Sequence, residues 1–177
     1  MFRKVVVLAL FTPALAFAAG GGGSSAPKPS ETTQSCTSGK VWDKKTKSCV
    51  QASNDLLDDE TLYGAVREFA YAGQYGHAQM ALAAMSDQTD DRVLTYWGFT
   101  HRKMGDVAKG MTFYREAIAK NPANILARSY MGQALVEQGD LVGARQQYKA
   151  IVDAGGQGSW AEASLHEAIA TGTTYSY

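Results

Sequence analysis

The residues that most often carry catalytic or metal chemistry are few in this sequence and poorly spaced for it. Its three histidines are His77, His101 and His166, and none belongs to a His-Glu-x-x-His pattern, in which two histidines one helical turn apart bind zinc. The sequence also lacks a Gly-x-Ser-x-Gly turn, which would present a nucleophilic serine. It therefore predicts neither a metal site nor a nucleophilic active site.

Two clusters of acidic residues could act as general acids or bases if a pocket shifted their pKa values. One spans residues 58–60, and the other comprises Asp87, Asp90 and Asp91. Both lie where helices are expected to begin, and acidic residues at such positions cap backbone N–H groups and interact favourably with the helix dipole. We therefore expect structural carboxylates, no enzymatic activity and no cofactor.

The only two cysteines, Cys36 and Cys49, lie in a segment with its own character. No histidine near them completes a zinc ligand set, so a disulfide between them is expected. The segment 36–50, CTSGKVWDKKTKSCV, has short apolar stretches around a polar turn, which predicts a disulfide-clamped hairpin. Its basic tip is either a solvated staple or a binding surface, with the candidate contact residues Trp42, Lys44, Lys45 and Lys47.

The first residues have the features of a secretory signal peptide. Arg3 and Lys4 precede an apolar run at 5–15, and residues 16–18, Ala-Phe-Ala, form a small-x-small cleavage pattern. The apolar run is shorter than the roughly 20 residues that span a bilayer. We therefore expect a signal peptide at residues 1–18 and a mature protein in the periplasm or outside the cell, where disulfides form.

The mature chain is expected to begin with a flexible linker at residues 19–35, because that segment consists almost entirely of Gly, Ser, Thr, Pro and Ala. A second flexible stretch, around Ser53 and Asn54, is expected to make the hairpin independent of the rest of the chain. Removing the signal peptide leaves 15 basic against 17 acidic residues, a net charge of −2. This balance gives no reason to expect nucleic acid as a partner, and no later apolar run is long enough to span a membrane.

From about residue 58 to 170, apolar residues recur with a helical period, and the segment repeats itself. The stretches KMGDVAKGMTFYREAIAKNP and EQGDLVGARQQYKAIVDAGG begin 34 residues apart. Both contain a Gly-Asp pair, in which the glycine suits the end of one helix and the aspartate caps the next. Together with a similar turn at residues 73–75, they predict three helix-turn-helix units at 59–90, 91–124 and 125–158.

These units resemble the tetratricopeptide repeat, a 34-residue helix-turn-helix pattern with large and small residues at set positions. The residues of the second and third units that match the pattern are Trp97, Gly98, Gly110, Tyr114, Ala117, Pro122, Gly132, Ala144, Tyr148 and Ile151. The sequence departs from it at His101, Arg128 and Gly156, where the family has Tyr, Trp and Pro.

The resemblance implies an all-α solenoid of about three units, preceded by the small disulfide-clamped hairpin. Ser159 and Glu162 form a Ser-x-x-Glu capping box, which predicts a last helix over 159–170. Such a helix would cap the array, because each unit of a solenoid buries its apolar side only against its neighbours.

The resemblance also implies a groove lined by the first helix of each unit, in which a segment of another protein binds. Transferred to this sequence, the groove positions are Tyr63, Arg67, Tyr71, Arg92, Thr95, Phe99, Arg102, Lys103, Ser129, Gln133 and Glu137. The groove residues of the first two units are mainly basic and aromatic, and those of the third unit are polar. This set favours a ligand with a carboxylate and an apolar anchor, although the same residues would also suit a solvated helix face.

The sequence therefore leaves two hypotheses for the function. The first is a non-enzymatic interaction module, a scaffold or adaptor of the bacterial cell envelope, that binds a peptide or helix of a protein partner in the groove. The second is a protein associated with cell-wall glycan through the basic, tryptophan-containing hairpin, with the repeats as a scaffold.

The signal peptide gives a direct prediction for the mature protein. Cleavage after Ala18 leaves Ala19 as the first residue, because residues 16–18 fit the small-x-small cleavage pattern. N-terminal sequencing of protein purified from its native cell measures this directly. Retention of Met1 would contradict the prediction.

Overall fold

A computed structural model describes residues 28–174 of the 177-residue chain. The expected signal peptide, residues 1–18, and residues 19–27 of the expected linker lie outside this range. Within it, none of the helices is both long enough and apolar enough to cross a membrane.

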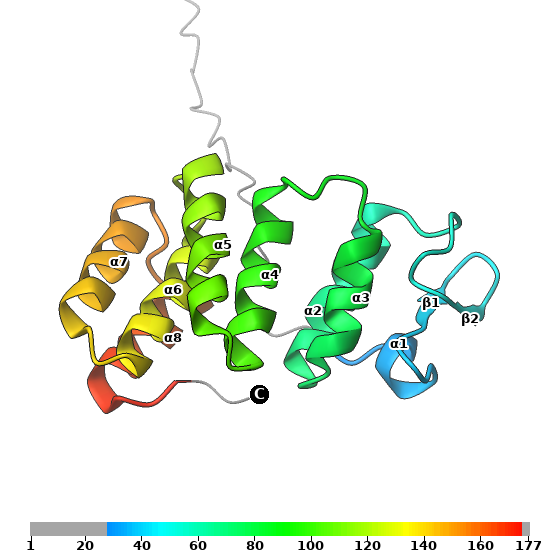
Figure 1. Cartoon of the computed structure of the whole chain (residues 1–177), viewed down its shortest axis with the longest axis horizontal. Helices are drawn as coiled ribbons and strands as arrows, with labels where there is room; N and C mark the ends of the chain where they lie inside the picture. Colours follow the sequence, from blue (N-terminus) through cyan, green and yellow to red (C-terminus); the bar gives the residue numbers. More distant parts are fainter. Residues whose placement is uncertain (1–27, 175–177) are drawn as a thin grey trace, which may run out of the picture.

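Most of the described residues form helices, and Figure 1 shows the main helices side by side as antiparallel pairs. The helices of the pairs are α2 (Asp59–Tyr71) with α3 (Tyr75–Ala84), α4 (Asp91–Lys103) with α5 (Val107–Lys120), and α6 (Ile125–Glu137) with α7 (Leu141–Asp153). A last helix, α8 (Trp160–Thr171), packs on α6 and α7. The expected all-α solenoid with a capping helix is confirmed.

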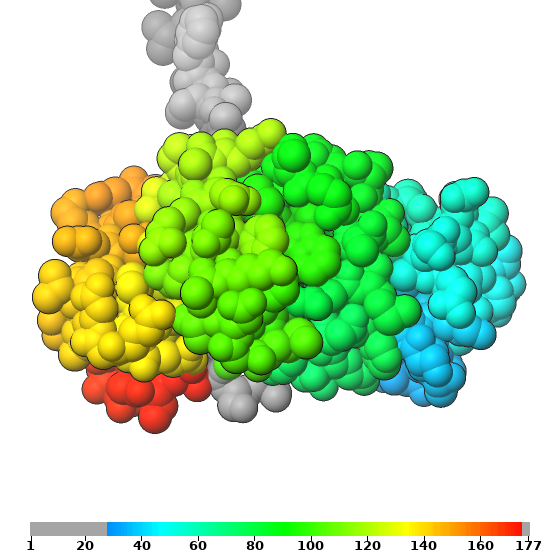
Figure 2. Space-filling view, viewed as in Figure 1, coloured from blue at the N-terminus to red at the C-terminus, as the bar shows by residue number. Residues whose placement is uncertain are grey.

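A short helix and a hairpin precede the pairs. They are α1 (Glu31–Gln34), β1 (Val41–Asp43) and β2 (Ser48–Val50), and the two strands pair antiparallel with Val41 opposite Val50. Cys36 and Cys49 form the expected disulfide, with their Cα atoms 5.6 Å apart. In the space-filling view, this N-terminal module covers one end of the stack and α8 lies at the other (Figure 2).

The turns inside the pairs follow from the Gly-Asp sequence. Gly105 and Gly139 have φ angles of 94° and 80°, a left-handed conformation that ends one helix at little steric cost. The side chain of Asp106 then accepts a hydrogen bond from the backbone N–H of Lys109, and Asp140 caps α7 in the same way. The repeated turn therefore fixes where each pair reverses direction.

Glycines also set how closely the two helices of the second pair approach. A Cβ atom at Gly98 would lie 2.5 Å from the ring of Tyr114 and 3.0 Å from the carbonyl oxygen of Gly110. Tyr114 is fully buried, so its ring has no open space to move into. Helices α4 and α5 therefore pack backbone to backbone at this point, which a side chain larger than hydrogen would prevent.

The structure corrects the expectation of a flexible linker for its last residues, 28–35. Ser30 caps α1 through its hydroxyl, and Thr32 is buried. The carboxylate of Glu68, on α2, accepts hydrogen bonds from the backbone N–H groups of Ser30 at 2.7 Å and Thr33 at 3.0 Å, and from both their hydroxyls. Composition pointed to a linker because it does not reveal a buried carboxylate 38 residues further along the chain.

The hairpin is likewise joined to the repeats, contrary to the expectation that residues near Ser53 and Asn54 make it independent. Val41 and Ala52 are 1% and 4% exposed and belong to the same core as the residues of α2. A Cβ atom at Gly39 would lie 2.8 Å from the ring of His77 on α3. The stretch between hairpin and α2 is a series of turns held by backbone hydrogen bonds, so the module acts as an N-terminal cap of the stack.

The close approach at Gly98 gives a prediction with a matched control. Gly98→Ala should lower the free energy of unfolding by about 1–3 kcal/mol, because the added methyl group overpacks the α4–α5 contact. Gly64 also lies inside a helix, but a Cβ atom there would meet nothing within 4 Å. Gly64→Ala should therefore raise the free energy of unfolding by up to about 1 kcal/mol. Denaturant unfolding followed by circular dichroism compares the two, and equal stability would show that the helices do not meet at Gly98.

The Glu68 contact gives a prediction with a pH dependence. Burial works to raise the pKa of Glu68, but the hydrogen bonds from Ser30 and Thr33 outweigh it and lower the pKa overall. Glu68→Gln should reduce the free energy of unfolding by about 2 kcal/mol at pH 7, because an amide matches the four donors poorly.

The sign of the pH effect follows from the lowered pKa. A carboxylate with a lowered folded pKa stabilises the fold above its unfolded pKa of about 4.3, and this contribution is lost as the pH falls through the folded value. The difference in free energy of unfolding between wild type and Glu68→Gln should therefore become smaller below about pH 4. The exposed Glu116 supplies the control, Glu116→Gln, which should change stability little at any pH. A Glu68 effect that is constant with pH would contradict the assignment.

Candidate partner-binding face

The eleven predicted groove residues lie on one row of helices formed by α2, α4 and α6, the first helix of each pair. Contacts join neighbours along this row. The guanidinium of Arg92 lies 4.7 Å from the ring centroid of Tyr63, and Arg102 Nε lies 3.9 Å from a carboxylate oxygen of Glu137. We call this surface the first-helix face. The helices bring the predicted set together, but they do not leave all of it accessible.

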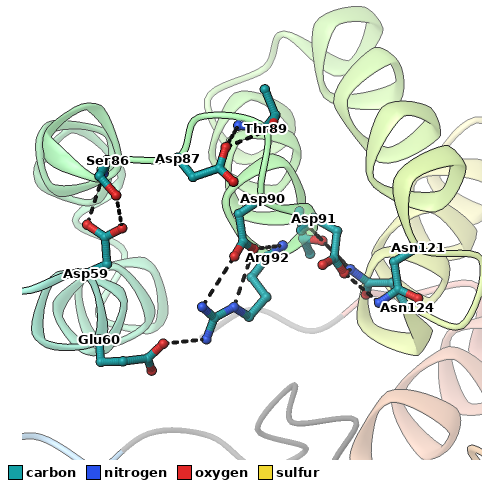
Figure 3. Close-up of polar contacts among 11 residues, drawn as sticks. Asp59, Glu60, Ser86, Asp87, Thr89, Asp90, Asp91, Arg92, Asn121 and Asn124 are labelled. Carbon is teal, nitrogen blue, oxygen red and sulfur yellow. Dashed lines mark hydrogen bonds and ion pairs between the residues drawn. The ribbon is translucent and has the colours of Figure 1, made fainter.

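The N-terminal edge of the row is a polar network between neighbouring pairs (Figure 3). Arg92 pairs with Glu60 at 2.9 Å and with Asp90 at 3.3 Å, and hydrogen bonds to these carboxylates raise its pKa against the opposing effect of burial. Asp91 accepts hydrogen bonds from Asn124 at 2.6 Å and from Asn121 at 2.9 Å. The acidic clusters therefore cap helices and join the pairs, and Arg92 braces α2 against α4.

Ser129 and Gln133 differ most from the expectation. Both have no exposed area, because α8 covers this part of α6. The amide of Gln133 donates to the hydroxyl of Ser164 on α8 at 2.9 Å and to that of Ser129 at 3.3 Å. Gly132, between them, has the side chain of Leu165 directly above it. Gln133 therefore joins α6 to the capping helix, Ser129 accepts a hydrogen bond from Gln133, and neither residue faces a partner.

Thr95, Phe99 and Arg102 are also buried within the row. The Thr95 hydroxyl donates to the carbonyl oxygen of Asp91 at 2.6 Å, as a residue one turn along the same helix can. Arg102 is 4% exposed and donates through Nη1 to the carbonyl oxygen of Tyr130 at 2.9 Å. Arg102 therefore ties α4 to α6, and its replacement by an acidic residue would disturb the fold as well as any binding.

Two aromatic residues on this face, Tyr130 and Trp160, were not predicted as part of the site, and they form a cluster with the predicted Tyr71 and Phe99. Tyr130 packs on Phe99 with ring centroids 4.7 Å apart, and its hydroxyl lies 3.2 Å from that of Tyr71. The ring centroid of Trp160, at the start of α8, lies 6.1 Å from that of Tyr71 and 6.2 Å from that of Tyr130. The cluster joins the first pair, the third pair and the capping helix. A usable signal was present, since Tyr96 and Tyr130 stand 34 residues apart, at the same position of successive units.

The part of the face that remains partly accessible combines positive charge with aromatic rings. Arg67, Tyr71, Lys103 and Trp160 are half-buried, and Glu137 is exposed at the end of α6. The Lys103 ammonium lies 6.0 Å from the ring centroid of Phe99. Burial lowers the pKa of Lys103, with a further contribution from neighbouring Arg102, and Glu137 partly offsets this.

The hairpin residues reach the same region from its N-terminal side. Trp42 and Lys44 line a cavity of about 440 Å³ between the N-terminal module and α2, and Arg67 and Glu68 form part of its opposite wall. Lys45 and Lys47, the other two candidate contacts, are exposed and do not line this cavity. The hairpin therefore contributes Trp42 and Lys44 to a hollow that shares Arg67 with the first-helix face.

Among residues 28–174, no three His, Cys, Asp or Glu side chains lie close enough together to hold a metal ion. His101 packs against Trp97 and Phe113, whose ring centroids lie 5.8 Å and 5.6 Å from its own and 6.1 Å from each other. Burial, with a contribution from Lys109, lowers the pKa of His101. This environment is that of a packed side chain.

A stack of antiparallel helix pairs with its first helices aligned on one face defines a helical-repeat protein. A family model described as tetratricopeptide repeat matches residues 101–169, which include α5 to α7 and most of α8. The match covers less than half of the chain, and together with the helical architecture it supports a protein of the tetratricopeptide repeat type, as the sequence pattern suggested. Comparisons with curated proteins and with solved structures gave no significant match.

Proposed function

We propose that this protein is a non-enzymatic scaffold or adaptor that binds a segment of a partner protein on its first-helix face. Tetratricopeptide repeats are protein-interaction modules, and the family match supports this general role. The observation that carries the proposal is the grouping of half-buried Arg67, Lys103, Tyr71 and Trp160 on that face.

The chemistry of these four residues indicates what the partner segment offers. Arginine forms charge-assisted hydrogen bonds with carboxylates, and lysine supplies a second positive charge. The rings of Tyr71 and Trp160, 6.1 Å apart, provide an apolar platform for one side chain. The best-fitting partner segment therefore carries an anionic group next to an aromatic or branched apolar residue.

Two features support a role in the bacterial cell envelope. Residues 1–18 have the pattern of a secretory signal peptide. The disulfide between Cys36 and Cys49 is of the kind that persists in oxidising compartments. We propose that the interaction takes place in the periplasm or outside the cell.

The hairpin cavity supports a second candidate function, binding of cell-wall glycan. Trp42 offers a ring on which a sugar can stack, and Lys44 and neighbouring polar groups offer hydrogen bonds. Co-sedimentation of the protein with insoluble peptidoglycan, and its loss in Trp42→Ala, would favour this function over the first.

The proposed function predicts the effect of reversing charge on the face. Once affinity purification has supplied a partner, the double variant Arg67→Glu, Lys103→Glu should bind it at least tenfold more weakly, about 1.4 kcal/mol, as measured by calorimetry. Arg102 is unsuitable for this test because its side chain is buried.

A matched control reverses two exposed arginines on the second helices, Arg115→Glu and Arg145→Glu. This control should bind the partner like wild type, and circular dichroism should show that both double variants remain helical. Unchanged affinity in the Arg67→Glu, Lys103→Glu variant would indicate that the partner binds to the hairpin or to the second helices instead.

A further inference from the structure

The chain turns back along α8 after that helix ends. Gly172 has a φ of 73° and closes the helix, and the backbone N–H of Thr173 donates to the hydroxyl of Thr171 at 3.2 Å. Thr173 and Thr174 then line a cavity of about 410 Å³ whose other walls are Trp160, Ala163, Ser164 and Glu167. Those four residues are spaced along one side of α8, so the chain returns beside the helix toward its start.

The last described residue is attached to the first-helix face. The hydroxyl of Thr174 donates to a carboxylate oxygen of Glu137 at 2.5 Å, and Glu137 in turn lies 3.9 Å from Arg102 on α4. Ser164 and Trp160, beside which the chain returns, contact Gln133 and Tyr130 of α6. The chain therefore arrives next to the residues proposed to bind a partner.

The residues that come next in the sequence have the chemistry proposed for a ligand of this face. They are Tyr175, Ser176 and Tyr177. Three residues reach up to about 10 Å, which brings aromatic side chains within range of neighbouring helices. Tyrosine rings pack on other aromatic rings and under lysine or arginine, and Tyr71, Trp160, Lys103 and Arg67 supply these partners.

We propose that the segment 173–177 is an intramolecular ligand of the first-helix face and competes there with the partner segment. This inference rests on the proposed function for the identity of the site, and it adds a built-in competitor to it. A tethered segment has an effective concentration in the millimolar range. If the free segment binds with a Kd of about 0.1 mM, an effective concentration of about 1 mM means that the tethered segment occupies the site in roughly ten of every eleven molecules.

The experiment uses the full chain with both tyrosines replaced, Tyr175→Ser and Tyr177→Ser, and a fluorescently labelled peptide of residues 171–177, TGTTYSY. Fluorescence anisotropy should show saturable binding of the peptide to this variant, and at least tenfold weaker binding to wild type, whose site is already filled. A peptide with both tyrosines replaced by serine is the matched control and should bind neither protein.

The site is tested by adding Arg67→Glu and Lys103→Glu to the tyrosine-free chain, which should weaken peptide binding. The proposal is overturned if the tyrosine-free chain shows no saturable binding up to about 1 mM peptide, or binds no better than wild type. It is also overturned if the charge reversal leaves peptide binding unchanged.

Competition with the purified partner separates this inference from the proposed function. The tyrosine-free chain should bind the partner more tightly than wild type, whereas equal affinity would overturn the competition. If the charge reversal weakens peptide binding but leaves partner binding unchanged, the proposed function fails and the intramolecular contact stands.

Discussion

Each helix pair of this protein can bury its apolar side chains only against the pair beside it. With three pairs, the end surfaces are a large part of the whole, and both ends need a cover. At the C-terminal end, α8 lays Leu165 over Gly132 and joins its Ser164 to Gln133. At the N-terminal end, the disulfide-closed module places Val41 and Ala52 in the core of the first pair. The rest of the architecture depends on these two covers.

The repeated elements were predictable because their physical causes are local. A glycine that ends a helix and an aspartate that caps the next lie side by side in the sequence, so Gly105-Asp106 and Gly139-Asp140 could be read directly. The close contact of α4 and α5 was also visible, since Gly98 matches the small-residue position of the family pattern. Local chemistry and a 34-residue period were sufficient for this part of the fold.

The covers and the accessible part of the site were less predictable because they depend on contacts between distant residues. Nothing in the composition of residues 28–35 shows that Glu68 accepts four hydrogen bonds from them. The family pattern places Ser129 and Gln133 on a groove, but only the three-dimensional path of α8 shows that they are buried. Arg92 was likewise expected to meet a ligand, and it is instead paired with Glu60 and Asp90. For Ser129, Gln133 and Arg92, the sequence placed the residue on the right helix but did not reveal the neighbour that covers it or pairs with it.

The shortness of the array also changes where a binding site can form. In a long solenoid, repeats alone line the binding surface, and caps lie far from it. Here Tyr71 of the first pair reaches Tyr130 of the third, and Trp160 of the capping helix contacts both. Arg67 also lines one cavity together with Trp42 and Lys44 of the hairpin. The covers that stabilise the ends therefore supply side chains to the candidate site, so stability and recognition depend on the same contacts.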